Sequence, residues 1–152
     1  MMILNTLKTA GIASALIFGT VGGVGFVANP VQAEPLSQLF TQNLIASGTF
    51  MTVQQNKATE GTARIVMENG KRYLEFDGGF TTAQGPDVQI ILHRNSSIPV
   101  NVNEADYVTL AQLKSFDGAQ RYELPANINP SDFQSVGIWC RKFNVTFGYA
   151  AL

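Results

Sequence analysis

The sequence predicts an all-β fold, a single antiparallel β-sandwich domain that follows a short helical lead-in and an export signal. Beyond residue 47, apolar and polar residues alternate with a period of two, which is typical of half-buried strands. Turn signals such as Asn69-Gly70, Gly85-Pro86-Asp87 and Asp117-Gly118 separate these stretches. One cysteine and one histidine in 152 residues exclude an internal disulfide and a structural zinc site, so a hydrophobic core must hold the domain together.

Residues 1–33 are expected to be a signal peptide. After Lys8 the chain runs for twenty residues, Thr9 to Ala28, without a charge, and Val31 and Ala33 fit a signal-peptidase site with cleavage before Glu34. The alternative is an uncleaved membrane anchor, because twenty apolar residues can cross a bilayer. On the cleaved reading, residues 34–152 are one exported domain, periplasmic or extracellular.

Residues 34–47 are the predicted lead-in. Leu36, Leu39 and Phe40 are spaced as on one apolar face of a short helix. The chain as a whole has a formal net charge of −1 and 14% charged residues. It therefore offers no basic surface to neutralise phosphates, and nucleic-acid binding is not expected.

The best-defined element is a hairpin around Asn69-Gly70, a pair that suits a type I′ turn. A two-residue loop sets the register of both strands. The outer face then carries Arg64 opposite Glu75 and Glu68 opposite Lys71, and the inner face carries Ile65 opposite Leu74 and Ala63 opposite Phe76. A slip by one residue would bury the charges, so this register is strongly specified.

Further strands follow along the chain. The run from Val88 to Leu92 is one, and Asp117-Gly118 predicts a second hairpin that pairs Leu113 with Tyr122. Asn129-Pro130 predicts the cap and first turn of a very short helix. The ranges 135–140 and 143–149 are apolar on both faces and are expected to be central strands of the sandwich.

Cys140 is the candidate functional residue. The sequence leaves three readings open: a small buried hydrophobe, a thiol that takes part in redox chemistry or binds a cofactor, or an intermolecular disulfide that links a dimer. Near the surface, Arg141 and Lys142 would favour its thiolate. His93 ends a strand and is expected on the surface, with a Cys–His dyad formed with Cys140 as the alternative.

Other chemistry finds no support in the sequence. It has no nucleophile elbow, no phosphate-binding glycine loop, no calcium loop and no paired carboxylates, so the chain is expected to be a module rather than a turnover enzyme, and no metal site is predicted. Trp139, Phe143, Phe147 and Tyr149 share parity if the last strand is continuous, and such a stripe is read as core packing.

An ordered series of motifs carries a family resemblance. It begins at Gly48-Thr49-Phe50 and Gly61-Thr62-Ala63, and it continues through Gly85-Pro86-Asp87 and residues 118–125. It closes with Ile138-Trp139-Cys140 and residues 143–150. This series resembles the DM-thirteen domain, often labelled an electron-transfer domain, over residues 46–152.

The resemblance implies a β-sandwich module of exported and cell-surface proteins, in which the cysteine matching Cys140 acts as a redox thiol or as a ligand to a prosthetic group such as haem. Many members carry a histidine in the stretch matching residues 55–59, where this chain has Lys57. A second haem ligand would then be missing or supplied by His93.

The first hypothesis is therefore an exported electron-transfer or thiol-redox module centred on Cys140, whose partner is a redox or cell-envelope protein. The rival is a non-catalytic binding or adhesion module of the cell envelope in which Cys140 is only packed and a loop such as residues 95–104 holds the partner. Either module is a monomer or a Cys140-linked dimer. It meets a membrane only through an uncleaved signal segment.

Overall fold

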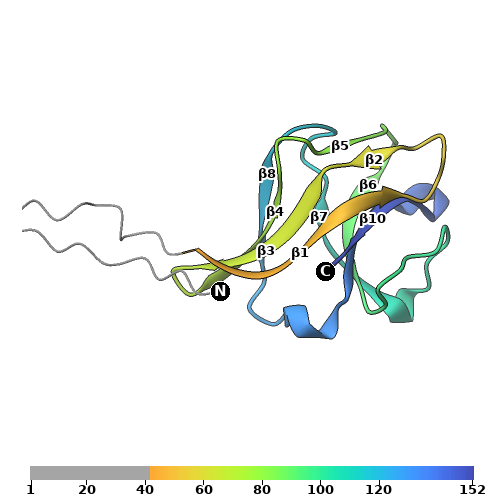
Figure 1. Cartoon of the computed structure of the whole chain (residues 1–152). Helices are drawn as coiled ribbons and strands as arrows, with labels where there is room; N and C mark the ends of the chain where they lie inside the picture. Colours follow the sequence, from red (N-terminus) through yellow and green to blue (C-terminus); the bar gives the residue numbers. More distant parts are fainter. Residues whose placement is uncertain (1–41) are drawn as a thin grey trace, which may run out of the picture. The chain divides into compact units, whose positions relative to one another are not determined.

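The computed structural model describes residues 42–152, which fold into antiparallel strands joined by short 3-10 turns (Figure 1). The strands are β1 (Asn43–Thr52), β2 (Thr59–Glu60), β3 (Thr62–Glu68), β4 (Lys71–Phe76), β5 (Thr81–Thr82), β6 (Val88–His93), β7 (Tyr107–Gln112), β8 (Gln120–Leu124), β9 (Ser135–Cys140) and β10 (Val145–Ala151). The 3-10 turns are η2 (Glu104–Asp106), η3 (Pro130–Asp132) and η4 (Arg141–Phe143). In this part of the chain no helix is long and apolar enough to cross a membrane.

The expected signal peptide and residues 34–41 of the expected lead-in lie outside the described residues. For the described part of the expected lead-in, the prediction of a helix is wrong, because β1 already begins at Asn43. Leu44 pairs with Val66 of β3 and Ala46 with Ile65, with a bulge between them. Pairing with a neighbouring strand therefore decides the conformation of these residues, and the helical spacing of their apolar neighbours does not.

The eight main strands follow the order β7-β6-β9-β10-β1-β3-β4-β8. Strand β1 belongs to both halves of this arrangement. Its first part, Asn43 to Thr49, pairs with β3, and its last part, Phe50 to Thr52, pairs with β10. The predicted antiparallel sandwich is confirmed, with β1 joining its two sheets.

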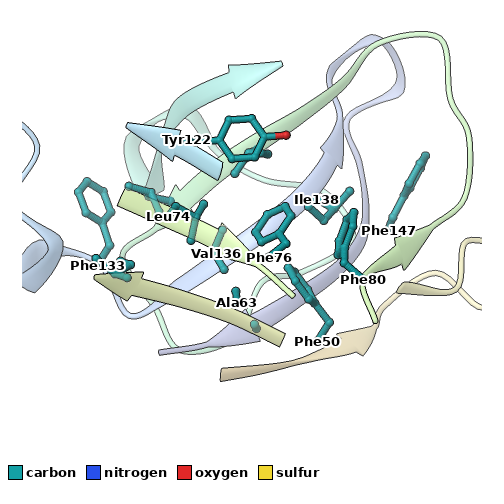
Figure 2. Packing of buried hydrophobic residues seen from close by; sticks show 14 of the residues in the cluster. Phe50, Ala63, Leu74, Phe76, Phe80, Tyr122, Phe133, Val136, Ile138 and Phe147 are labelled. Atoms are coloured by element: carbon teal, nitrogen blue, oxygen red, sulfur yellow. The ribbon is translucent and has the colours of Figure 1, made fainter. Parts of the chain in front are cut away.

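The core lies between these sheets, and Figure 2 shows its packing. Phe76 of β4 lies at its centre, with its ring centroid 5.2 Å from that of Phe50, 4.5 Å from Phe80 and 5.8 Å from Tyr122. The β9 and β10 side contributes buried Val136, Ile138, Cys140, Phe147 and Ala150. Strands β9 and β10 are central in the strand order, as predicted, and the end of β9 is packed in this core.

The hairpin around Asn69 and Gly70 is confirmed. Both residues have positive φ, 51° and 77°, as a type I′ turn requires. The predicted register of β3 and β4 is found at every position, and Arg64 forms an ion pair of 2.7 Å with Glu75.

The other predicted charge pair of this hairpin forms differently. Lys71 contacts Glu123 at 3.1 Å, and Glu68 contacts Arg121. The reason is that β8 lies on the far side of β4 and supplies nearer partners of opposite charge.

The second predicted hairpin is wrong. Strand β7 pairs with β6, and β8 pairs with β4, so the chain between them crosses from one sheet to the other. The Asp117-Gly118 turn instead holds the β5 region, since Gly118 N donates to Phe80 O at 2.8 Å. The predicted short helix is confirmed as η3, where the Asn129 side chain accepts a hydrogen bond from Ser131 N.

The last strand begins two residues later than the sequence predicted. Residues 141–143 form η4, Asn144 has a φ of 49°, and β10 begins at Val145. This break and a bulge between Thr146 and Gly148 change the parity of the following residues. The predicted single stripe is therefore wrong: Trp139 packs in a smaller cluster with Ile91, Ile98 and Val102, Phe147 lies in the main core, and Phe143 is 61% exposed.

Candidate functional site

Cys140 is the last residue of β9, and its neighbours across the sheet are Val88 of β6 and Val145 of β10. It is 1% exposed and belongs to the main core. The thiol is therefore buried rather than near the surface, where Arg141 and Lys142 would favour its thiolate. Such burial disfavours the Cys140-linked dimer, because the sulfur of one chain must reach the sulfur of another to form a disulfide.

Cys140 also lines a cavity of about 260 Å³. The walls are Gln54 and Lys57 from the turn after β1, residues 84–86, and Cys140, Phe143, Val145 and Phe147 from the β9–β10 corner. Phe143 is exposed and Lys57 half-buried, so this cavity opens to solvent beside them. The structure thus brings the corner that contains Cys140 together with two segments that are far from it in the sequence. We call this cavity the Cys140 pocket.

The walls of the pocket are fixed by backbone contacts. Val53 N and Gln54 N donate to Phe147 O at 2.8 and 3.2 Å, and Lys57 N donates to Gln54 O at 2.7 Å, which ties the turn after β1 to β10. On the opposite wall, a Cβ atom at Gly85 would lie 3.0 Å from both Phe147 Cζ and Val88 Cγ2. These distances are shorter than ordinary van der Waals contacts. A glycine at residue 85 therefore keeps the pocket open.

The two cations that follow Cys140 in the sequence interact with other groups than its sulfur. Arg141 Nε lies 2.7 Å from Asp87 Oδ2, and Arg141 N donates to Asp87 O at 2.9 Å. The hydrogen bond from Arg141, with a second from Gln89, lowers the pKa of the Asp87 carboxyl. The charge of Arg141 is therefore neutralised. The ammonium of Lys142 lies 5.6 Å from the ring of Phe143.

Lys57 is the charged residue that the fold brings to the pocket. Its Nζ donates to Gln84 O at 3.2 Å and lies 5.3 Å from the centroid of the Phe147 ring. No sequence pattern placed Lys57 beside Cys140, which follows it by more than eighty positions. The family resemblance singled it out only as the residue found where other members have histidine.

His93 lies at the other end of β6. It is 1% exposed, pairs with Ser135 and Tyr107, and its Nδ1 accepts a hydrogen bond from Asn95 N at 3.1 Å. The expectation of a surface histidine is therefore wrong. Val88, which pairs with Cys140, is five residues away along the strand, a distance of about 16 Å. His93 therefore forms no dyad with Cys140 and is not a second ligand in its pocket.

The residues of the pocket do not fit haem. Their cavity of 260 Å³ lies below the roughly 300–1,000 Å³ of sites for drug-sized ligands, and haem is larger than most of these. Cys140 is the one strong iron ligand in the pocket lining, and the described residues contain no cluster of three or more His, Cys, Asp or Glu side chains that could hold a metal.

The loop that the rival hypothesis named is anchored at two buried positions and exposed at the other eight of residues 95–104. Ile98 and Val102 are buried against Trp139, and Asn144 hydrogen-bonds both backbone groups of Val102. The exposed residues of this loop are mostly polar, with Pro99 and Val100 as the apolar ones.

Comparisons with known proteins give one match. The family model described as "Electron transfer DM13" matches residues 49–152, which is about two thirds of the chain and includes every wall of the Cys140 pocket. No curated protein and no solved structure matches the chain.

Proposed function

The chain belongs to the electron transfer DM13 family, and from that premise we propose that it is an exported thiol-redox module whose reacting atom is Cys140 Sγ. The observation that carries the proposal is the position of this cysteine. It lies in the wall of a solvent-accessible pocket, although its residue is almost fully buried.

The single cysteine limits the chemistry. With no second cysteine in the 152 residues, an oxidised Cys140 cannot form a disulfide within the chain. Its oxidised form is then a mixed disulfide with another molecule or a sulfenic acid. Both products need room beside the sulfur, and the 260 Å³ pocket supplies it. The partner is a redox molecule or protein that delivers a small group into the pocket.

Export is part of the proposal and rests on residues 1–33, with their uncharged run and the small residues before Glu34. An exported cysteine meets oxidants and disulfides rather than the reducing glutathione and thioredoxin systems of the cytosol. A shielded pocket would restrict which of these compounds reaches the thiol.

The test is alkylation of the folded full chain with iodoacetamide, a small neutral reagent, followed by mass spectrometry. We expect one carboxamidomethyl group on the native protein and none on Cys140→Ser. Labelling that appears only after denaturation would contradict the proposal. A Soret band in protein purified from its native host would show that haem binds, contrary to the fit described above.

A second measurement separates this function from the adhesion hypothesis. Cys140→Ser and Cys140→Ala should both abolish the redox role in the native host while the free energy of unfolding stays within about 1–2 kcal/mol of the natural protein. Full function of both variants would favour a binding module in which Cys140 is only packed.

A further inference from the structure

The Cys140 pocket has an uncompensated positive charge at its mouth. Lys57 is the single charged residue among the nine that line the pocket. The ion pairs in residues 42–152 use other cations, namely Arg64, Lys71, Arg121 and Arg141. No carboxylate of the described chain therefore lies within 4.0 Å of the Lys57 ammonium. Its neighbours there are a backbone carbonyl and an aromatic ring.

The side chain of Lys57 is also held in place. Its ammonium donates to Gln84 O at 3.2 Å and lies over the Phe147 ring, so it spans from the turn after β1 to the opposite wall. The backbone of the same turn is tied to Phe147 O. A cation that is fixed at an opening attracts anions more effectively than one on a freely moving side chain, since less side-chain entropy is lost on binding.

The remainder of the pocket is small and largely apolar. Phe147 is 2% exposed, Pro86 and Val145 contribute further apolar walls, and a Cβ atom at Gly85 would narrow the space. A compound that fits must therefore be compact, with a carbon or sulfur part inside and a negative charge at the mouth. These requirements describe a small disulfide that carries a carboxylate.

We propose that the Cys140 pocket takes small anionic disulfides, and that Lys57 selects them by their negative charge. This inference rests on the proposed thiol function. In the reaction the Cys140 thiol gives its proton to solvent, and Sγ attacks one sulfur of the ligand. A new S–S bond joins Cys140 to that half of the ligand, and the old S–S bond breaks. The other half leaves as a thiolate with the bonding electron pair. Cys140 is thereby oxidised, and the leaving half is reduced.

The experiment compares two disulfides of similar size, dianionic dithiodiglycolate and neutral bis(2-hydroxyethyl) disulfide. The rate of mixed-disulfide formation on the full chain is measured for each by mass spectrometry. We expect Lys57→Gln to lower the ratio of the anionic to the neutral rate about fivefold, the effect of one charge at a partly solvated site. Lys57→Arg should keep the ratio within about twofold of the natural protein.

Lys114→Gln is a matched control. Lys114 Nζ likewise donates to a backbone carbonyl, Arg121 O, and lies over an aromatic ring, 4.5 Å from the Tyr122 centroid, but it is not part of the pocket. The same loss of charge there should leave the rate ratio unchanged. The comparison therefore separates a local effect of Lys57 from a general effect of net charge.

The outcomes distinguish the two proposals. If iodoacetamide labels native Cys140 but the rate ratio is the same in Lys57→Gln and the natural protein, anion selection is wrong and the thiol function stands. An equal fall in Lys57→Gln and Lys114→Gln would likewise overturn selection by Lys57. If neither disulfide nor iodoacetamide reaches native Cys140, both proposals fail together.

Discussion

Asn144 Oδ1 accepts a hydrogen bond of 2.9 Å from the indole Nε1 of Trp139, across the corner between β9 and β10. The same oxygen accepts from Val102 N at 3.0 Å, and Asn144 Nδ2 donates to Val102 O at 3.1 Å. Asn144 also has a left-handed backbone, with a φ of 49°. One side chain therefore fixes the corner that bears Cys140 and the loop that covers Trp139.

Replacement of Asn144 tests this arrangement. Asn144→Gly tolerates the left-handed backbone but removes three hydrogen bonds, so we expect the free energy of unfolding to fall by about 2–3 kcal/mol. Asn144→Ala adds the cost of a Cβ in this conformation, about 1 kcal/mol more. Urea unfolding followed by Trp139 fluorescence measures both. Equal stability of the two variants would show that the backbone conformation carries no cost.

Phe76 is expected to be the side chain on which the core depends most. It contacts the rings of Phe50, Phe80 and Tyr122 and is 2% exposed (Figure 2). Phe76→Ala should lower the free energy of unfolding by about 3–5 kcal/mol, because a cavity is left between the sheets. Phe143→Ala is the control. Its ring is 61% exposed, so a change within about 0.5 kcal/mol is expected.

Gly85 tests whether the pocket is the route to Cys140. In Gly85→Ala the new methyl group meets Phe147 and Val88 at 3.0 Å and narrows the cavity. We expect the rate of iodoacetamide labelling of native Cys140 to fall by about tenfold or more, with labelling of the denatured chain unchanged. At Gly78 a Cβ meets nothing within 4 Å. Gly78→Ala should therefore label at the natural rate, and an unchanged rate in Gly85→Ala would place the route elsewhere.

The Arg141–Asp87 pair predicts a dependence of stability on acid. The hydrogen bond from Arg141 lowers the pKa of Asp87 in the folded state. The folded pKa of Asp87 therefore lies below its unfolded pKa of about 3.9. The stabilisation of the folded state by this ion pair is fully present above the unfolded pKa, and it is lost as the pH falls through the folded pKa.

Asp87→Asn should accordingly flatten the fall in thermal stability below about pH 4, as followed by circular dichroism. Asp132→Asn is the control, since Asp132 forms no ion pair among residues 42–152. If thermal stability falls equally with decreasing pH in the natural protein and in Asp87→Asn, this ion pair does not contribute to folding.

Local patterns predicted the parts of the fold that local physics determines. The Asn69-Gly70 turn sets its own register through positive φ, so both strands of that hairpin were predictable residue by residue. The Asp117-Gly118 turn has the same kind of signal, yet its flanking strands pair with β6 and β4. Whether the chain forms a hairpin or crosses between the sheets depends on which pairing buries more of the core. A short sequence pattern does not hold that information.

The site shows the same division. Cys140 could be singled out from the sequence because it is the one cysteine and because its motif resembles a family. Its pocket could not be predicted, because its walls come from three separate segments. More than fifty residues lie between Pro86 and Cys140 alone. Lys57 and Gly85 acquire their roles only when β10 and the turn after β1 meet. His93 was misplaced because a strand end was taken to be exposed, whereas the next loop covers it.

Strand β1 also separates the start of the described chain from the Cys140 pocket. The described chain enters this strand at Asn43, and the turn that carries Lys57 follows its other end, ten residues later. An extended strand of that length spans about 30 Å. The first described residues of β1 and the turn that bears Lys57 therefore lie at opposite ends of one strand, so a change at Asn43 is remote from the opening above Cys140.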